Sequence, residues 1–125
     1  MRTFRRRRIL NILLLLGALL LTACAGQTEE PPGMGAKAER GYAVCNFIIQ
    51  ILELYKSDTG TYPDSLAELV PNYSSSMPAE VNGEPIIYHK TADGYELSFS
   101  YIGPGMNVCT YSTQEGRQWR CSGAY

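Results

Sequence analysis

Residues 36–63 read AKAERGYAVCNFIIQILELYKSDTGTYP, and this stretch decides the fold. Between residues 36 and 57 the polar side chains recur at spacings of seven, four, three and four, which places them on one narrow stripe of a helix. Most other positions are apolar, so we expect the helix to be wrapped on most of its circumference. Gly41 weakens the first turns, and Gly60 is expected to cap the end in the left-handed conformation. The polar stripe is Glu39, Asn46, Gln50, Glu53 and Ser57.

A second, shorter helix is predicted directly after this stretch. Ser65 and Glu68 have the spacing of a capping box, and Pro71 stops the helix. Residues 72–85 contain serines, two further prolines and an Asn-Gly pair, and this composition is typical of a loop. The inner face of the short helix is expected to be Leu66, Leu69 and Val70.

The following segments alternate between apolar and polar residues. Residues 85–90 (PIIYHK) and 95–101 (YELSFSY) flank the sequence TADG, which is a hairpin signal. In 95–101 the aromatic and apolar side chains share one face, and the polar side chains share the other. Alternation with one polar face indicates an antiparallel sheet that is covered on one side, here by the apolar helix. The chain is therefore predicted to have an α+β fold.

A second hairpin is expected at the end of the chain, from residues 107–112 and 117–121. A three-residue loop at 114–116, with Gly116 in the left-handed position, would place Thr113 opposite Arg117. The same register pairs Tyr111 with Trp119, and aromatic side chains form favourable cross-strand pairs.

This register also brings two of the four cysteines together. Cys109 lies opposite Cys121, so we predict a disulfide between them. Cys45 is then a buried thiol of the helix, which is a common structural role for cysteine. The alternative is a bridge from Cys45 to one of the two strand cysteines, which would join the helix to the sheet.

The N-terminal residues have the parts of an export signal. A basic head, MRTFRRRR, precedes an apolar segment at residues 9–21. As a helix this segment would be about 20 Å long, which is short of the roughly 30 Å hydrocarbon core of a bilayer. The quartet LTAC at residues 21–24 resembles the lipobox of bacterial lipoproteins, in which the cysteine is lipidated and becomes the first residue of the mature chain.

We therefore expect residues 1–23 to be a lipoprotein signal peptide and Cys24 to carry the acyl chains that anchor the protein. The alternative is an ordinary signal peptide with an incidental cysteine. Residues 24–35 (CAGQTEEPPGMG) have the composition of a flexible tether, and residues 36–125 form the globular domain. The expected location is the bacterial cell envelope, on the outer membrane in a diderm host, with the domain outside the cytoplasm.

The charge balance changes once the signal is removed. Five of the eleven basic residues lie in the basic head, so the mature chain keeps six basic against twelve acidic residues. It has no cluster of Lys and Arg, and nucleic acid is excluded as an expected partner. Export also brings the remaining cysteines to a compartment where disulfides persist.

The run LYKSDTGTYP (residues 54–63) and the SLAEL that follows at 65–69 resemble the major pseudopilin of type II secretion. The characteristic run of that family is L-Y-K-x-D-x-G-x-Y-P, followed by a short helix, a loop and strands. NGEPIIY at residues 82–88 is similar to the family's W-G-x-P-Y-x-Y strand, with Asn82 in place of tryptophan. The resemblance covers residues 36–101. It implies a pilin-like fold and a protein partner in the cell envelope, in type II secretion or a pilus-like apparatus.

Two features depart from the family. Pseudopilins have a prepilin peptidase site before an apolar assembly helix, whereas here Gly17 precedes ALLLT and a lipobox occupies the region. A chain cut at Cys24 is not expected to polymerise in the same way. The calcium loop of the family needs several carboxylates near the C-terminus, and from Gly103 onward this chain has only Glu115. We therefore expect no metal and no cofactor.

No set of residues predicts catalysis. His89 lacks partners at metal-ligand spacing, Ser74–Ser76 lack a nucleophile elbow, and Asp58 and Asp64 belong to a helix end and a turn. We expect a membrane-anchored structural or protein-interaction module rather than an enzyme. One alternative is a ligand-binding lipoprotein that uses exposed tyrosines and the 72–85 loop. Another is a small redox protein that uses Cys45 with a strand cysteine, although burial of a thiol on an apolar face raises its pKa.

Overall fold

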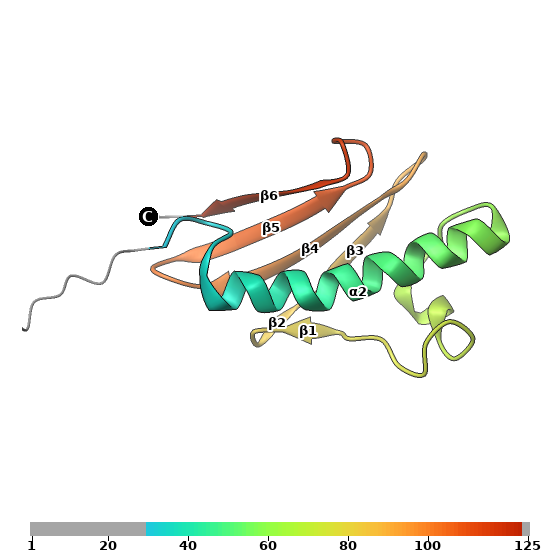
Figure 1. Ribbon diagram of the computed structural model, residues 1–125, viewed down its shortest axis with the longest axis horizontal. Coiled ribbons are helices and arrows are strands. Elements are labelled where there is room, and N and C mark those ends of the chain that lie inside the picture. Colours follow the sequence, from blue (N-terminus) through green and yellow to red (C-terminus); the bar gives the residue numbers. More distant parts are fainter. Residues whose placement is uncertain (1–29, 124–125) are drawn as a thin grey trace, which may run out of the picture.

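The computed structural model describes residues 30–123, in which one long helix lies across an antiparallel sheet (Figure 1). The predicted α+β, pilin-like fold is confirmed. The helix α2 spans Gly35–Thr59 and is followed by the 3-10 helix η1, Leu66–Leu69. The strands are β1 (Glu80–Val81), β2 (Glu84–Pro85), β3 (Ile87–Lys90), β4 (Tyr95–Ile102), β5 (Met106–Ser112) and β6 (Gln118–Gly123).

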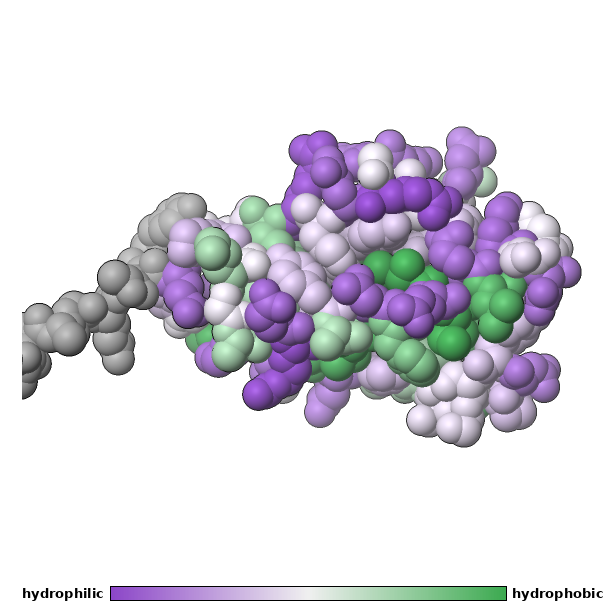
Figure 2. All heavy atoms as spheres, viewed as in Figure 1, coloured by the Kyte–Doolittle hydropathy of each residue, from purple (hydrophilic) through white to green (hydrophobic). Residues whose placement is uncertain are grey.

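The helix α2 is buried along one side only. Its ends match the prediction closely, and Gly60 caps it with a φ of 83°. The predicted wrapping on most of its circumference is wrong, because Phe47 and Leu54 remain exposed. Figure 2 shows hydrophobic side chains on the face of the molecule that carries α2. The residues of α2 that are buried are Ala38, Gly41, Cys45, Ile48 and Leu52.

A four-stranded sheet with the order β3-β4-β5-β6 packs against that buried side. Along β4 the side chains alternate as predicted, with the apolar and aromatic ones directed into the core and Glu96 exposed. The helix therefore covers one face of the sheet and leaves the other face open. The buried side chains of β4 are Tyr95, Leu97, Phe99 and Tyr101.

The region predicted as a loop contains a small hairpin. β1 and β2 pair with each other around Asn82 and Gly83, whose φ values are 59° and 79°. Two successive residues with positive φ are typical of the tight turn that Asn-Gly pairs favour. The prediction of loop up to Pro85 is therefore wrong at its end. The predicted strand 85–90 is also interrupted at Ile86, whose N–H donates to the carbonyl of Ala79 at 2.9 Å.

The last hairpin has the predicted register over most of its length. Tyr111 lies opposite Trp119 and Cys109 opposite Cys121, and the two cysteines form a disulfide. The ladder stops one pair earlier than expected, at Ser112 and Gln118. Thr113 is not opposite Arg117. Its N–H donates instead to the carbonyl of Tyr95, the first residue of β4.

Candidate functional site

The start of α2 and the residues just before it are held against the sheet by three side-chain contacts. The N–H of Gly33 donates to the hydroxyl of Tyr101 on β4 at 2.9 Å, and the hydroxyl of Tyr42 donates to the carbonyl of Gly33 at 3.0 Å. The same Tyr42 oxygen lies 3.0 Å from Sγ of Cys121. The predicted tether 24–35 lies in part outside the described residues, but Gly33 near its end is attached to the domain and Gly35 is the first residue of α2. We call Gly33, Tyr42, Tyr101 and the Cys109–Cys121 disulfide the N-terminal clasp.

The clasp lies at the end of the domain where the chain enters and leaves. Figure 1 shows the start of α2 beside the end of β6 and the turn between β4 and β5. Lys37 in the first turns of α2 donates from Nζ to the carbonyl of Ile102 at 2.5 Å, which adds a contact to that turn. Residues 1–29, including the predicted signal peptide and Cys24, lie outside the described residues.

A second polar cluster surrounds Glu53 on α2. Its carboxylate accepts hydrogen bonds from the hydroxyls of Tyr62 and Tyr95, at 3.1 and 3.3 Å to Oε1. Arg117, in the turn between β5 and β6, donates from Nη1 to the same oxygen at 3.0 Å and from Nη2 to the Tyr62 hydroxyl at 3.2 Å. This Glu53 cluster joins the helix, the loop after it and two parts of the sheet.

The electrostatics of this cluster favour a fixed structure. Hydrogen bonds to Tyr62 and Glu53 raise the pKa of Arg117, so its charge persists. Burial, with the Glu53 carboxylate nearby, raises the pKa of Tyr95. Burial is also the main cause of the raised pKa of Tyr62. The two hydroxyls therefore stay protonated and act as donors, which is what a structural hydrogen-bond network requires.

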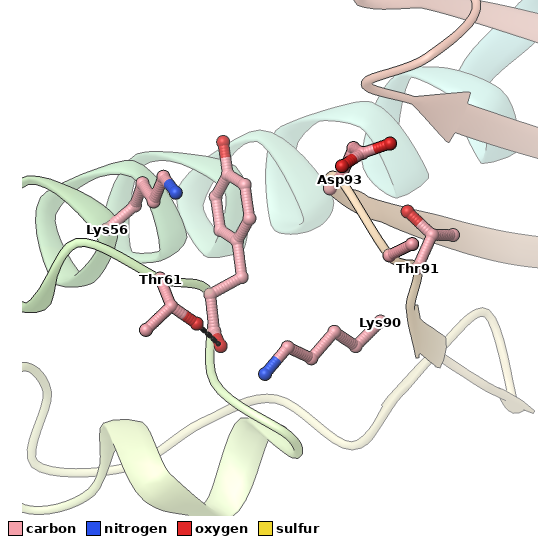
Figure 3. A pocket seen from close by; sticks show the side chains of 8 residues that line it. Lys56, Thr61, Lys90, Thr91 and Asp93 are labelled. Atoms are coloured by element: carbon pink, nitrogen blue, oxygen red, sulfur yellow. Dashed lines mark hydrogen bonds between the residues drawn. The ribbon is translucent and has the colours of Figure 1, made fainter.

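A small pocket of about 200 Å³ lies between the C-terminal end of α2 with the loop after it and the turn between β3 and β4 (Figure 3). Its two lysines are already engaged. Lys56 donates to the carbonyl of Gly60 at 2.6 Å and lies over the ring of Tyr62, and Lys90 forms an ion pair with Asp64 at 2.6 Å. The hydroxyl of Thr91 is buried and lacks a hydrogen-bond partner in the described part of the chain. The pocket therefore offers one hydroxyl but no converging set of acid, base and nucleophile.

The residues considered for chemistry are dispersed over the domain. His89 is exposed on β3, opposite Glu96, and Ser75 and Asp58 are exposed in different loops or helix ends. Asp64 is engaged with Lys90, as noted above. Among residues 30–123 no group of three or more His, Cys, Asp or Glu side chains is placed to hold a metal ion.

Cys45 is the free cysteine within the described residues, and it is fully buried between helix and sheet. Burial raises the pKa of its thiol to about 12. A thiol that stays protonated and has no access to solvent is a poor redox group, because the thiolate is the reactive form. This observation disfavours the redox alternative and the alternative bridge from Cys45 to a strand cysteine.

Sequence reasoning missed both the Glu53 cluster and the tyrosine contacts of the clasp. The spacing of polar residues predicts only that Glu53 lies on the polar stripe of the helix, and Arg117 is 64 residues further along the chain. The two positions are too far apart in the sequence for any helix or strand periodicity to predict that they meet. The signal that could have found the cluster is the Tyr-Pro pair at 62–63 directly after the helix, since it turns a tyrosine back toward Glu53.

The comparison with protein families decides the classification. The chain matches the model described as type II secretion system (T2SS), protein G, over residues 33–116. The chain belongs to this family. The match begins at Gly33, the first residue of the clasp, and reaches Gly116 in the turn before β6. No curated protein and no solved structure matches the chain.

Membership in the T2SS protein G family confirms the resemblance to the major pseudopilin. The family is structural rather than enzymatic, and it supports an association with type II secretion and with the cell envelope. Among the described residues, no helix has both the length and the apolar character that a membrane span requires.

Proposed function

We propose that this T2SS protein G domain acts as a lipid-anchored structural and protein-interaction module of the secretion apparatus. The observation that carries the proposal is the combination of the family domain, which begins at Gly33, with the LTAC quartet nine residues upstream of it. In this proposal Cys24 is lipidated, residues 24–32 span the gap between membrane and domain, and the clasp is the point at which this tether joins the domain.

The described geometry supports a scaffold rather than a catalyst. The Glu53 cluster and the clasp both use their polar groups to hold the helix on the sheet, and both lysines of the pocket near Lys56 are engaged. Binding surfaces of such a domain are its exposed faces. The protein partner is therefore expected to contact the open face of the sheet or the exposed side of α2.

The anchor is tested by replacing Cys24 with serine in the full chain. We expect Cys24→Ser to accumulate as uncleaved precursor without acyl mass, measured by mass spectrometry of the membrane and soluble fractions. A Cys45→Ala variant is the matched control, because it removes a cysteine that is buried inside the domain. This variant keeps Cys24 and should be lipidated normally. If Cys24→Ser is processed and retained on the membrane like the parent, the anchor proposal fails.

The association with secretion is tested separately, by affinity capture of the lipidated chain from its own membranes after brief chemical cross-linking. Recovery of other secretion-system components would support the proposal. Capture without any such component, from membranes in which the anchor is intact, would contradict the association while leaving the anchor proposal standing.

A further inference from the structure

One flank of α2, beside its buried side, carries a stripe of four apolar residues with spacings of three, four and three. This is the spacing of a seam between two packed helices. Phe47 and Leu54 have 41% and 49% of their surface exposed, although both are large hydrophobic residues. Val44 and Ile51 are half-buried and touch the core with their inner edges. An apolar stripe that leaves two large side chains exposed to solvent indicates an interaction surface.

The apolar stripe ends in side chains of opposite charge. Arg40 precedes Val44 by four residues, and Asp58 follows Leu54 by four residues, so both continue the same line along the helix. Both are exposed, and neither forms an ion pair with another residue in the range 30–123. The hydroxyl of Tyr73 lies near Asp58.

We propose that this stripe binds the same stripe of a second copy of the chain, with the two α2 helices antiparallel. Residues whose numbers add to 98 then lie opposite each other. Arg40 of each copy meets Asp58 of the other copy, and the apolar pairs are Val44 with Leu54 and Phe47 with Ile51. Because both copies use the same surface, the contact closes at a dimer and does not extend into a filament.

The charges also decide the orientation. In a parallel arrangement Arg40 would face Arg40 and Asp58 would face Asp58, and like charges across an interface are unfavourable. The antiparallel arrangement converts both contacts into attractions. The stripe from residue 40 to residue 58 is about 27 Å long at 1.5 Å per residue, so the contact area is modest and the dimer is expected to be weak. This inference does not depend on the lipid anchor or on the secretion partners.

The orientation is tested by mixing two variants of the full chain, extracted from membranes in detergent. One is Arg40→Cys and the other is Asp58→Cys, and they carry tags of different mass. After mild oxidation we expect the mixed disulfide dimer to exceed either homodimer on the order of tenfold, since only opposed positions come within disulfide reach. The unmodified chain provides the background. An excess of the two homodimers would show parallel packing and would overturn the proposal.

The energetic contribution of the charges is tested by reversal and rescue. Arg40→Asp alone should raise the dimer Kd about tenfold, because it makes two contacts repulsive. The double variant Arg40→Asp/Asp58→Arg should return the Kd to within about twofold of the parent. Glu39→Lys is the control, because this exposed residue lies on the polar stripe, away from the seam.

A third variant removes part of the apolar stripe without touching the core. Leu54→Ala should weaken the dimer while the circular dichroism spectrum and the melting curve at low protein concentration stay as in the parent. Sedimentation velocity on the full chain measures all of these variants. A chain that stays monomeric at every concentration overturns the proposal. So does association that appears only after another membrane protein is added, or a Kd that Leu54→Ala leaves unchanged.

Discussion

Gly41 on α2 and Phe99 on β4 lie in direct contact, and the contact has room for hydrogen but not for a methyl group. A Cβ atom at position 41 would overlap Cδ2, Cε2 and Cζ of the Phe99 ring. The residue that weakens the helix locally is therefore the one that lets the helix approach the sheet closely. Its cost in helix propensity, about 1 kcal/mol relative to alanine, is offset by this packing.

Gly41→Ala should therefore destabilise the domain. Overpacking of a core costs about 1–3 kcal/mol, which outweighs the gain in helix propensity. Chemical denaturation of the full chain measures the loss. Ser57→Ala, at an exposed position of the same helix, should be close to neutral, and Phe99→Leu combined with Gly41→Ala should cost less than the two changes added together. Strict additivity would contradict the proposed contact.

Removal of the charge at the centre of the Glu53 cluster should have a larger effect than removal of an isolated surface charge. Glu53→Gln keeps the shape of the side chain but leaves Arg117 and two tyrosine hydroxyls with a weaker acceptor, so we expect a loss of about 1–2 kcal/mol in the free energy of unfolding. Glu115→Gln is the control, because Glu115 pairs only with exposed Arg120 at 3.2 Å and such a pair contributes less than about 1 kcal/mol. Equal effects of the two changes would show that the cluster contributes no more to stability than an isolated surface ion pair.

The helix, the main sheet and the last hairpin could be predicted from sequence because each has a local signal. Period-two alternation predicts β4, and a turn with Gly116 at its end predicts the pairing of Tyr111 with Trp119. The wrapping of α2 could not be predicted in this way. Apolar periodicity indicates which residues avoid water but not what covers them, and one four-stranded sheet covers only one side of a helix.

The candidate sites were less accessible to sequence reasoning. The Glu53 cluster joins residues that are up to 64 positions apart, and only the folded chain brings them together. The hairpin of β1 and β2 has two residues in each strand, which is too short for an alternation to be recognised. The disulfide was predictable because hairpin register connects Cys109 and Cys121 through their immediate sequence neighbours.

The disulfide should contribute strongly to the stability of this small domain. It closes a loop with a sequence separation of 12, and the chain-entropy model assigns about 3 kcal/mol to a loop of this size. The double variant Cys109→Ala/Cys121→Ala should lose about this amount in denaturant titrations. Peptide mapping of the exported chain without reduction should find Cys109 joined to Cys121. A disulfide peptide that contains Cys45 would contradict the observed pairing.

Cys45 should make stability depend on pH in the alkaline range. Burial raises the pKa of its thiol from 9.0 in the ordinary case to about 12 in the folded chain, so the unfolded chain loses this proton first as the pH rises. The stabilisation is complete below pH 9 and is lost progressively between pH 9 and 12. From pH 8 to pH 10 we expect the free energy of unfolding to fall by about 1 kcal/mol through this group.

A Cys45→Ala variant isolates this effect, because the tyrosines with raised pKa, which are half-ionised in the unfolded chain at pH 10, lower the stability of the variant and the parent alike. From pH 8 to pH 10 the free energy of unfolding should fall by about 1 kcal/mol more in the parent than in the variant, whatever the absolute values. Parallel curves for the variant and the parent would show that Cys45 does not titrate as the structure indicates.

The N-terminal clasp also has a mechanical consequence. Tension in the segment that leads to the domain would act first on Gly33, which bonds through its N–H to Tyr101 on β4 and through its carbonyl to Tyr42. Tyr42 in turn contacts Cys121, which is covalently joined to the neighbouring strand. A pulling force would therefore be divided between β4 and β6, and the disulfide passes the share on β6 to β5. The first turn of α2 would be shielded from unwinding until these contacts break.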